Sequence, residues 1–203
     1  MIGTATTPDA YQLLHEGIQC FADIEEAGIR VDTEYVRKTR AWCRKRAEKL
    51  QRKMESTKFH KKWKKEFGEK TNIGSDKQLS HMLFNVMGYK PKSYTEKSKG
   101  KEEKDKTPQV NEATLQEIDD PFIKMMIERN KILKDEGTFL KGIDEETVDG
   151  FLHAFFNLHT ARSYRSSSDR PNFQNFPIRD PVRAKRIRSS FRSRGKKYSL
   201  AAM

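Results

Sequence analysis

Cysteine is scarce in this chain: Cys20 and Cys43 are the only two among 203 residues. Neither forms part of a Cys-x-x-Cys pair or of the His/Cys spacing typical of metal sites. No apolar run approaches the ~18 residues of a membrane-spanning helix, and the first residues lack the pattern of a secretory signal. The sequence therefore argues against a disulfide scaffold, a zinc finger and a membrane span, and it favours a reducing cytoplasm.

Negative charge is also in short supply. Lysine and arginine total 41 against 29 for aspartate and glutamate, which leaves a net charge of +12. Nearly all of the excess lies in one segment, because residues 162–197 hold 12 basic and 2 acidic side chains, a net of +10. General solubility does not explain such clustering, whereas a polyanionic partner does.

Hydrophobic residues make up only 34% of the chain, the same share as charged residues. This composition predicts a modest core, in one large domain or in one and a half small ones. Aromatic residues at 10% and clear apolar periodicity argue against disorder of the whole chain.

The N-terminal third predicts two helices joined by an extended segment. Thr7 is the expected N-cap of the first helix, with Pro8 at its first position and Gly28 at its end. Ile29–Asp32 is expected to be extended, and Asp32 to cap a long helix of roughly Thr33–Ser56. One face of the first helix carries apolar residues at spacings of three and four, namely Tyr11, Leu14, Ile18, Phe21 and Ile24.

Residues 58–67 alternate lysines with aromatic side chains. Nucleic-acid bases stack on aromatic rings, so this segment could bind a nucleic acid. Phe59, Trp63 and Phe67 are also spaced by four, which is typical of a stripe that faces a core. Both interpretations place the lysines on the opposite face.

Further helices are predicted from their caps. Ser75 and Gln78 fit a capping box at the start of a helix that ends at Gly88. Asn111 is expected to cap a short helix, and Asp120-Pro121 to begin a longer one that runs to Gly142. Residues 90–107 are polar and lack periodicity, which favours a loop, and the aromatic run after Gly150 favours strands.

The C-terminal block, Tyr164–Arg179, reads Y-R-S-S-S-D-R-P-N-F-Q-N-F-P-I-R. It resembles the R-L-S-S-[ST]-D-P-N-L-Q-N-I-P block of family A DNA polymerases, the bacterial polymerase I type that includes many phage enzymes. Other segments resemble motifs of the same family in the same order, namely Glu25–Asp32, Thr71–Leu79, Gly88–Pro91, Arg129–Lys134, His153 and Ile187–Phe191.

Some positions depart from the family pattern. The family's T-G-R reads Ser163-Tyr164-Arg165 here, and Arg162 is a rival for the role of the motif arginine. Arg170 occupies the slot of the family's aspartate. Asp76 replaces a proline, which suits the first turn of a helix.

The resemblance implies an α+β fold: a mainly helical thumb with long antiparallel helices, followed by the first β-strands of a polymerase palm. It divides the chain into a connecting helix (1–32), a thumb (33–143, with a mobile tip at about 90–110) and the N-terminal part of a palm (144–203). The palm portion contains the block that binds primer–template.

The resemblance also implies which side chains contact DNA. Arginine forks onto phosphates or reaches minor-groove acceptors, which occur in every base pair, while amides and hydroxyls add further contacts. The alternative is that the amides cap local turns and the lysines line solvated helix faces. The basic segment Arg183–Lys197 is expected to add affinity for phosphate. The predicted DNA-binding residues are Arg165, Ser167, Ser168, Asn172, Gln174, Asn175, Arg179 and Arg188, with Lys77, Gln78, Lys131 and Lys134 in the thumb.

No catalytic residue is assigned to this chain. The family uses two metal ions, taken here as Mg²⁺, held by carboxylates, and the chain ends at Met203, where the first of these aspartates is expected. The resemblance therefore implies one part of a DNA-directed DNA polymerase, inactive alone. A second polypeptide would carry the carboxylates, in the cytoplasm of a bacterium or of a phage-infected cell. The alternatives are a noncatalytic clamp that keeps the thumb, and a helical adaptor that does not bind DNA.

Overall fold

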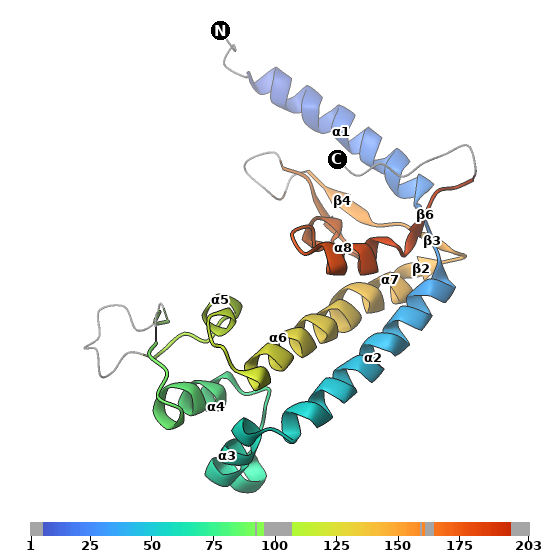
Figure 1. Ribbon diagram of the computed structural model, residues 1–203. Helices are drawn as coiled ribbons and strands as arrows, with labels where there is room; N and C mark the ends of the chain where they lie inside the picture. The colour runs from blue at the N-terminus through green and yellow to red at the C-terminus, as the bar shows by residue number, and fades with distance from the viewer. Residues whose placement is uncertain (1–5, 92, 96–106, 159, 161–164, 196–203) are drawn as a thin grey trace. The chain divides into compact units, whose positions relative to one another are not determined.

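The computed structural model describes residues 6–91, 93–95, 107–158, 160 and 165–195 (Figure 1). It contains two compact units. The helical unit comprises Lys45–Ile132, and the sheet unit comprises the segments up to Arg44 and from Leu133. The predicted division at residues 32 and 143 follows the family's motifs and stays a prediction beside these contact-based limits.

Helix α1 (Thr7–Ala27) belongs to the sheet unit. Its N-cap is Thr6, one residue before the predicted one, and Thr6 and Asp9 form a reciprocal capping box. None of its 21 residues is buried. On the predicted apolar face, Tyr11 is 72% and Ile18 is 59% exposed, while Phe21 stacks on Phe156 with ring centroids 5.2 Å apart.

A four-stranded antiparallel sheet organises the sheet unit, in the order β2 (Thr147–Val148), β3 (Phe151–Leu152), β1 (Ile29–Val31) and β6 (Phe191–Arg192). The predicted extended segment is thus β1, one of the two inner strands. Strand β2, which the sequence did not predict, reaches β3 through Asp149 and Gly150, with φ of 48° and 80°. Positive φ at both positions is what a tight hairpin requires.

A second, two-stranded sheet pairs β4 (Phe155–Asn157) with β5 (Ser167–Asp169). The core of the sheet unit gathers side chains from β1, β3, β6, the start of α2 (Thr33–Glu55), the π-helix η5 (Asp135–Leu140), α7 (Lys141–Glu146), the short helix η6 (Phe173–Asn175) and α8 (Pro181–Arg188). Its buried members are Val31, Val36, Phe139, Ile143, Leu152, Phe176, Ile187 and Phe191.

The helical unit is built from α3 (Lys58–Phe67), η1 (Gly68–Lys70), α4 (Asp76–Ser80), the π-helix η2 (His81–Val86), α5 (Glu112–Gln116) and α6 (Pro121–Lys134), together with the second half of α2. Phe59 and Trp63 are buried, and both pack on Phe122, with ring centroids 4.5 and 5.8 Å apart. The aromatic stripe of residues 58–67 is therefore a core stripe and does not stack on bases.

The predicted antiparallel packing of long helices is found within the sheet unit, between the first half of α2 and the segment η5–α7. Arg44 of α2 pairs with Glu136, and Arg40 of α2 pairs with Asp144. Residue numbers therefore fall along α2 while they rise along η5 and α7. With the small antiparallel sheets, this arrangement confirms the α+β class.

Several predicted helix starts are confirmed. Asp32 accepts a hydrogen bond from Tyr35 N (2.9 Å), Asn111 accepts one from Thr114 N (2.9 Å), and Asp120 accepts one from Phe122 N (2.7 Å). Of the predicted loop, residues 92 and 96–106 lie outside the described residues. At its base, Thr95 N donates to Thr107 O at 2.9 Å.

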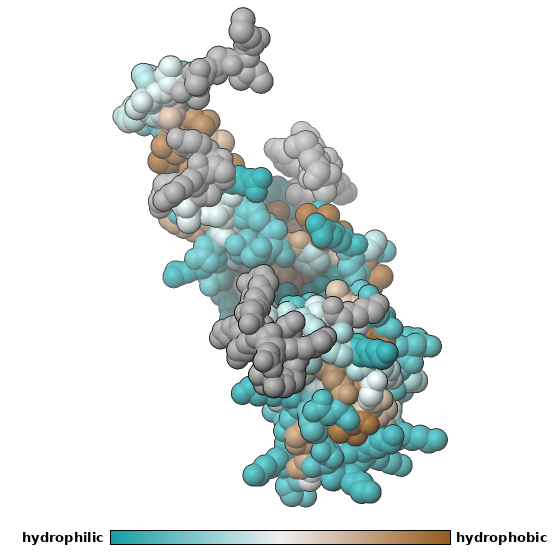
Figure 2. Space-filling model, turned by 90° about the vertical axis from the view of Figure 1, so that its left-hand side faces the viewer, coloured by the Kyte–Doolittle hydropathy of each residue, from teal (hydrophilic) through white to brown (hydrophobic). Residues whose placement is uncertain are grey.

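The surface displayed in Figure 2 is mostly hydrophilic with scattered apolar patches, which fits a chain that is 34% charged. Across the ranges that the structure describes, no helix has both the length and the apolar character needed to cross a membrane.

Candidate nucleic-acid interface

The C-terminal block is described from Arg165 onward, and Gln174 holds it together. The amide oxygen of Gln174 accepts hydrogen bonds from Ser168 N (2.8 Å) and Ser168 Oγ (2.6 Å), and its amide nitrogen donates to Ser166 O (3.2 Å). Ser168 is only 3% exposed, and its Oγ also accepts from Phe173 N at 2.9 Å. Both side chains, predicted to contact DNA, therefore have their polar atoms engaged within the block.

Asn172 has a similar local role. Its side-chain oxygen accepts a hydrogen bond from Asn175 N (3.2 Å) and so caps η6. The expectation that amides cap local turns thus describes Asn172 and Gln174 well. Asn175 is exposed and Ser167 is half-buried, so both have surface available for a ligand.

Three of the predicted contacts are exposed arginines: Arg165 and Arg179 of the C-terminal block, and Arg188 at the end of α8. Within the described part of the chain, no acidic side chain forms an ion pair with any of the three. Their guanidinium groups are therefore free to fork onto phosphate oxygens or groove acceptors. Arg162, the rival for the motif arginine, lies outside the described residues.

Other cations of the basic segment are already paired. Asp135 is fully buried, and it accepts hydrogen bonds from Arg183 Nη2 (2.6 Å), Arg183 Nε (2.8 Å) and Arg186 Nη1 (2.5 Å). Arg192 pairs with Asp32 at 3.0 Å. The expectation that the whole segment adds phosphate affinity is therefore wrong for Arg183 and Arg186, which bind α8 to η5 through a buried carboxylate.

A second carboxylate network lies beside this one. Glu136 accepts from Arg40 Nε (3.1 Å) and Arg44 Nη2 (2.8 Å). Burial opposes ionisation of Glu136, but the hydrogen bonds from Arg44 and Arg40 hold its pKa below its usual value. Burial raises the pKa of the nearby Cys43 thiol to about 11.

The predicted contacts from the helical unit and the end of α6 divide into free and engaged side chains. Lys77 and Lys134 are exposed. Lys131 pairs with Glu112 at 2.8 Å. Ser75 accepts a hydrogen bond from Gln78 N, as predicted, but the Gln78 amide does not complete the capping box. It accepts from Trp63 Nε1 (3.1 Å) and Asn72 N (2.9 Å) and donates to Lys70 O (2.8 Å).

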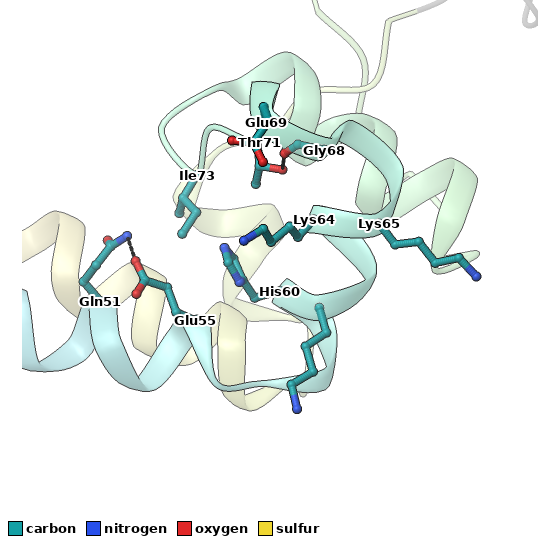
Figure 3. A pocket seen from close by; sticks show the side chains of 10 residues that line it. Gln51, Glu55, His60, Lys64, Lys65, Gly68, Glu69, Thr71 and Ile73 are labelled. Carbon is teal, nitrogen blue, oxygen red and sulfur yellow. Dashed lines mark hydrogen bonds between the residues drawn. The ribbon is translucent and has the colours of Figure 1, made fainter.

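The helical unit also has a basic pocket that was not among the predicted sites. It lies beside α3 and is lined by His60, Lys61, Lys64 and Lys65, among others. In Figure 3, Lys64 and His60 point toward the hydrogen-bonded Gln51–Glu55 pair, whereas Lys65 points away from it. The signal in the sequence was the lysines that flank Phe59 and Trp63, because burial of those rings turns the lysines outward.

The resemblance implies a pair of catalytic metal ions, which carboxylate groups would hold. Among the residues that it describes, no group of three or more His, Cys, Asp and Glu side chains could hold a metal ion. The described carboxylates include helix caps, such as Asp32 and Asp180, and partners of arginines, such as Asp135. The described residues therefore do not fit the metal pair that the resemblance implies.

The helical unit and the sheet unit with its braced, basic loop match the fold of a polymerase domain. The solved POL domain of Pol1 from M. smegmatis, in complex with DNA primer–template and dNTP, matches this fold with a TM-score of 0.67 and 24% sequence identity. The match covers 88% of this chain and 29% of that one.

The sequence comparisons identify the family. The family model described as DNA polymerase family A matches residues 40–203, so the chain belongs to DNA polymerase family A. DNA polymerase I of Synechocystis sp. is 31% identical over 176 residues, which are 84% of this chain and 16% of that protein. The thermostable DNA polymerase I of Thermus aquaticus is 29% identical, over 84% of this chain and 19% of the relative. The DNA polymerase of Bacillus phage SP01 is 25% identical, over 79% of this chain and 21% of that protein. The chain thus spans about a fifth or less of these relatives.

Proposed function

We propose that this chain grips primer–template DNA as the thumb and first palm strands of a DNA-directed DNA polymerase. The observation that carries the proposal is the set of three exposed, unopposed arginines, Arg165 and Arg179 in the C-terminal block and Arg188 at the end of α8. The relatives are DNA polymerases, and the matched POL domain was solved with a primer–template.

The chemistry of the arginines suits a duplex of any sequence. A guanidinium group binds phosphate oxygens in a bidentate fork, and in the minor groove it meets acceptors that all base pairs present. Asn175 and Ser167 lie in the same block and add exposed or half-exposed polar groups. Lys77 and Lys134 supply further cations for the backbone. The remaining predicted contacts already have partners within the protein and would have to exchange them to reach DNA. They are Ser168, Asn172, Gln174, Gln78 and Lys131.

In this proposal a second polypeptide carries the catalytic metal ligands and completes the enzyme. Divalent ions held by that polypeptide would supply the activation of the primer hydroxyl. Helix α1 supports a partner, since it has no buried side chain and its apolar residues Tyr11, Leu13 and Ile18 are more than half exposed. A surface of this kind is typical of an interaction site.

The test is equilibrium binding of a labelled primer–template to the purified chain, measured by anisotropy over a range of salt concentrations. Removing Arg165, Arg179 or Arg188 singly (→Ala) should weaken binding and lower the log–log salt slope by roughly one unit each. Arg37→Ala is the matched control, because it removes an exposed guanidinium group of α2 that does not belong to the block or to α8. If all four variants lose affinity for the primer–template equally, the assignment of the block as the DNA contact is overturned.

Primer extension by the same preparation tests the second polypeptide. The chain alone should incorporate no nucleotide, and incorporation by the purified chain would contradict the proposal. A noncatalytic clamp is the alternative, which predicts duplex binding by a chain that co-purifies with no polymerase partner.

A further inference from the structure

A shallow groove in the sheet unit lies between α2 and α8, and neither the family assignment nor the predicted contacts account for it. Its walls include Tyr35, Lys38, Trp42, Val182, Lys185 and Arg186. Trp42 is 48% exposed, in contrast to Trp63, the other tryptophan, which is fully buried. Val182 is 68% exposed beside it. A half-exposed indole next to apolar and basic side chains is a surface that a planar, anionic ligand would cover.

Contacts of Arg186 hold the shape of the groove. Arg186 lies over the Trp42 ring, with its guanidinium carbon 4.9 Å from the ring centroid. Its charge is anchored by the fully buried Asp135, and its backbone carbonyl accepts a hydrogen bond from Tyr35 Oη at 3.0 Å. The indole is therefore backed by a fixed cation, which is a preorganised stacking platform.

The rim of the groove is cationic. Lys185 is exposed, and within the residues that the structure describes it has no ion pair. Lys38 pairs with Glu34 at 2.6 Å, but both side chains are about three-quarters exposed (75% and 77%). An ion pair so exposed is weak and exchanges readily for another anion. A ligand that lies on Trp42 thus meets two ammonium groups within the same groove.

We propose that this groove binds an unpaired nucleotide of a nucleic-acid strand, with its base stacked on Trp42 and its phosphate bound by Lys185 and Lys38. The ligand is single-stranded because the faces of paired bases are covered by their neighbours in a duplex, whereas an unpaired base offers a free face. The inference rests on the proposed function, since a primer–template carries a single-stranded template beyond its duplex. It adds a second contact, distinct from the arginines of the C-terminal block.

Intrinsic fluorescence tests the proposal, because the chain contains only two tryptophans and only Trp42 is exposed. Titration with short oligothymidylate should quench the emission of the full chain and reduce the access of acrylamide to the indole. Trp42→Ala should abolish the quenching and weaken oligothymidylate binding about tenfold, the scale of one lost base stack. Trp42→Phe keeps a ring and should retain most of the affinity. Lys185→Glu should weaken binding and its salt dependence, with circular dichroism confirming that each variant is folded.

Duplex binding, measured in parallel, separates this proposal from the proposed function. Trp42→Ala should leave affinity for blunt duplex unchanged, whereas Arg165→Ala should reduce it. Oligothymidylate binding that is equally tight in Trp42→Ala and the wild type would overturn the groove as a nucleotide site. The same conclusion follows if an acidic peptide protects Trp42 from acrylamide and the oligonucleotide does not. If the wild type does not bind duplex but its fluorescence is quenched by oligothymidylate, the proposed primer–template grip is overturned and the groove remains a nucleotide site.

Discussion

At the scale of single residues, Asp135 stands out as the one charged side chain that is buried among the described residues. It is fully buried and holds Arg183 and Arg186, which are themselves 15% and 14% exposed. A buried carboxylate is stable in this setting only because both oxygens accept charge-assisted hydrogen bonds. The same contact fixes Arg186 against the Trp42 ring, so one residue joins the stability of α8 to the shape of the groove.

The consequence can be measured with Asp135→Asn, which keeps the shape and removes the charge. Two guanidinium groups would lose their counter-ion, and we expect the free energy of unfolding to fall by about 3 kcal/mol or more. Glu128→Gln is the control, because its ion pair with Arg46 is exposed (44% and 36%) and should contribute less than about 1 kcal/mol. Urea denaturation followed by circular dichroism measures both, and similar losses in the two variants would show that burial does not set the cost.

At the scale of elements, the sequence predicted helices better than strands. Caps such as Asn111 and Asp120 act within one turn, so their residues reveal them directly. Strand β1 pairs with β3 and β6, which follow it by more than 100 residues, and no local pattern specifies such partners. The hairpin at Asp149-Gly150 was legible in the sequence, because that dipeptide is typical of a two-residue turn, but the prediction started the strands only after Gly150.

The candidate site shows the same contrast between features that the local sequence reveals and features that depend on folding. The choice of arginines such as Arg165 as predicted contacts needed only the charge of the segment and its motif. The engagement of Gln174 with Ser168 did not follow, since the motif names residue types and does not say whether an amide faces the ligand or its own backbone. Only the contact of β5 with η6 settles that question for this loop.

Gln174 should accordingly act as a positioning residue of the C-terminal block. Gln174→Ala removes the acceptor of Ser168 and the donor to Ser166, so we expect faster amide exchange at Ser168 and several-fold weaker duplex binding. Asn175→Ala is the comparison, because its exposed side chain should affect binding without loosening the loop. Weakened binding in Gln174→Ala with amide exchange at the wild-type rate would point to a direct DNA contact for Gln174.

At the scale of the whole molecule, the central question is what covers α1. Isolated helices are marginal in water, and most helix stability in proteins comes from packing an apolar face. Helix α1 has a good capping box and a terminal glycine, and among the described residues Phe21 and Glu25 contact β4, but no side chain of α1 is buried. The proposed second polypeptide would supply the missing packing, on a surface that includes Leu13, Ile18 and Ile24.

The two cysteines make this interface measurable. Cys20 lies exposed on α1, whereas Cys43 is buried and its pKa is raised to about 11, so little of it is thiolate at pH 8. A maleimide should therefore label Cys20 in the isolated chain quickly and Cys43 slowly, with Cys20→Ser and Cys43→Ser assigning each rate. A polypeptide that restores nucleotide incorporation should slow the labelling of Cys20 and leave Cys43 unchanged. If incorporation is restored while Cys20 reacts as fast as before, the partner binds elsewhere, and the exposed apolar face of α1 requires another explanation.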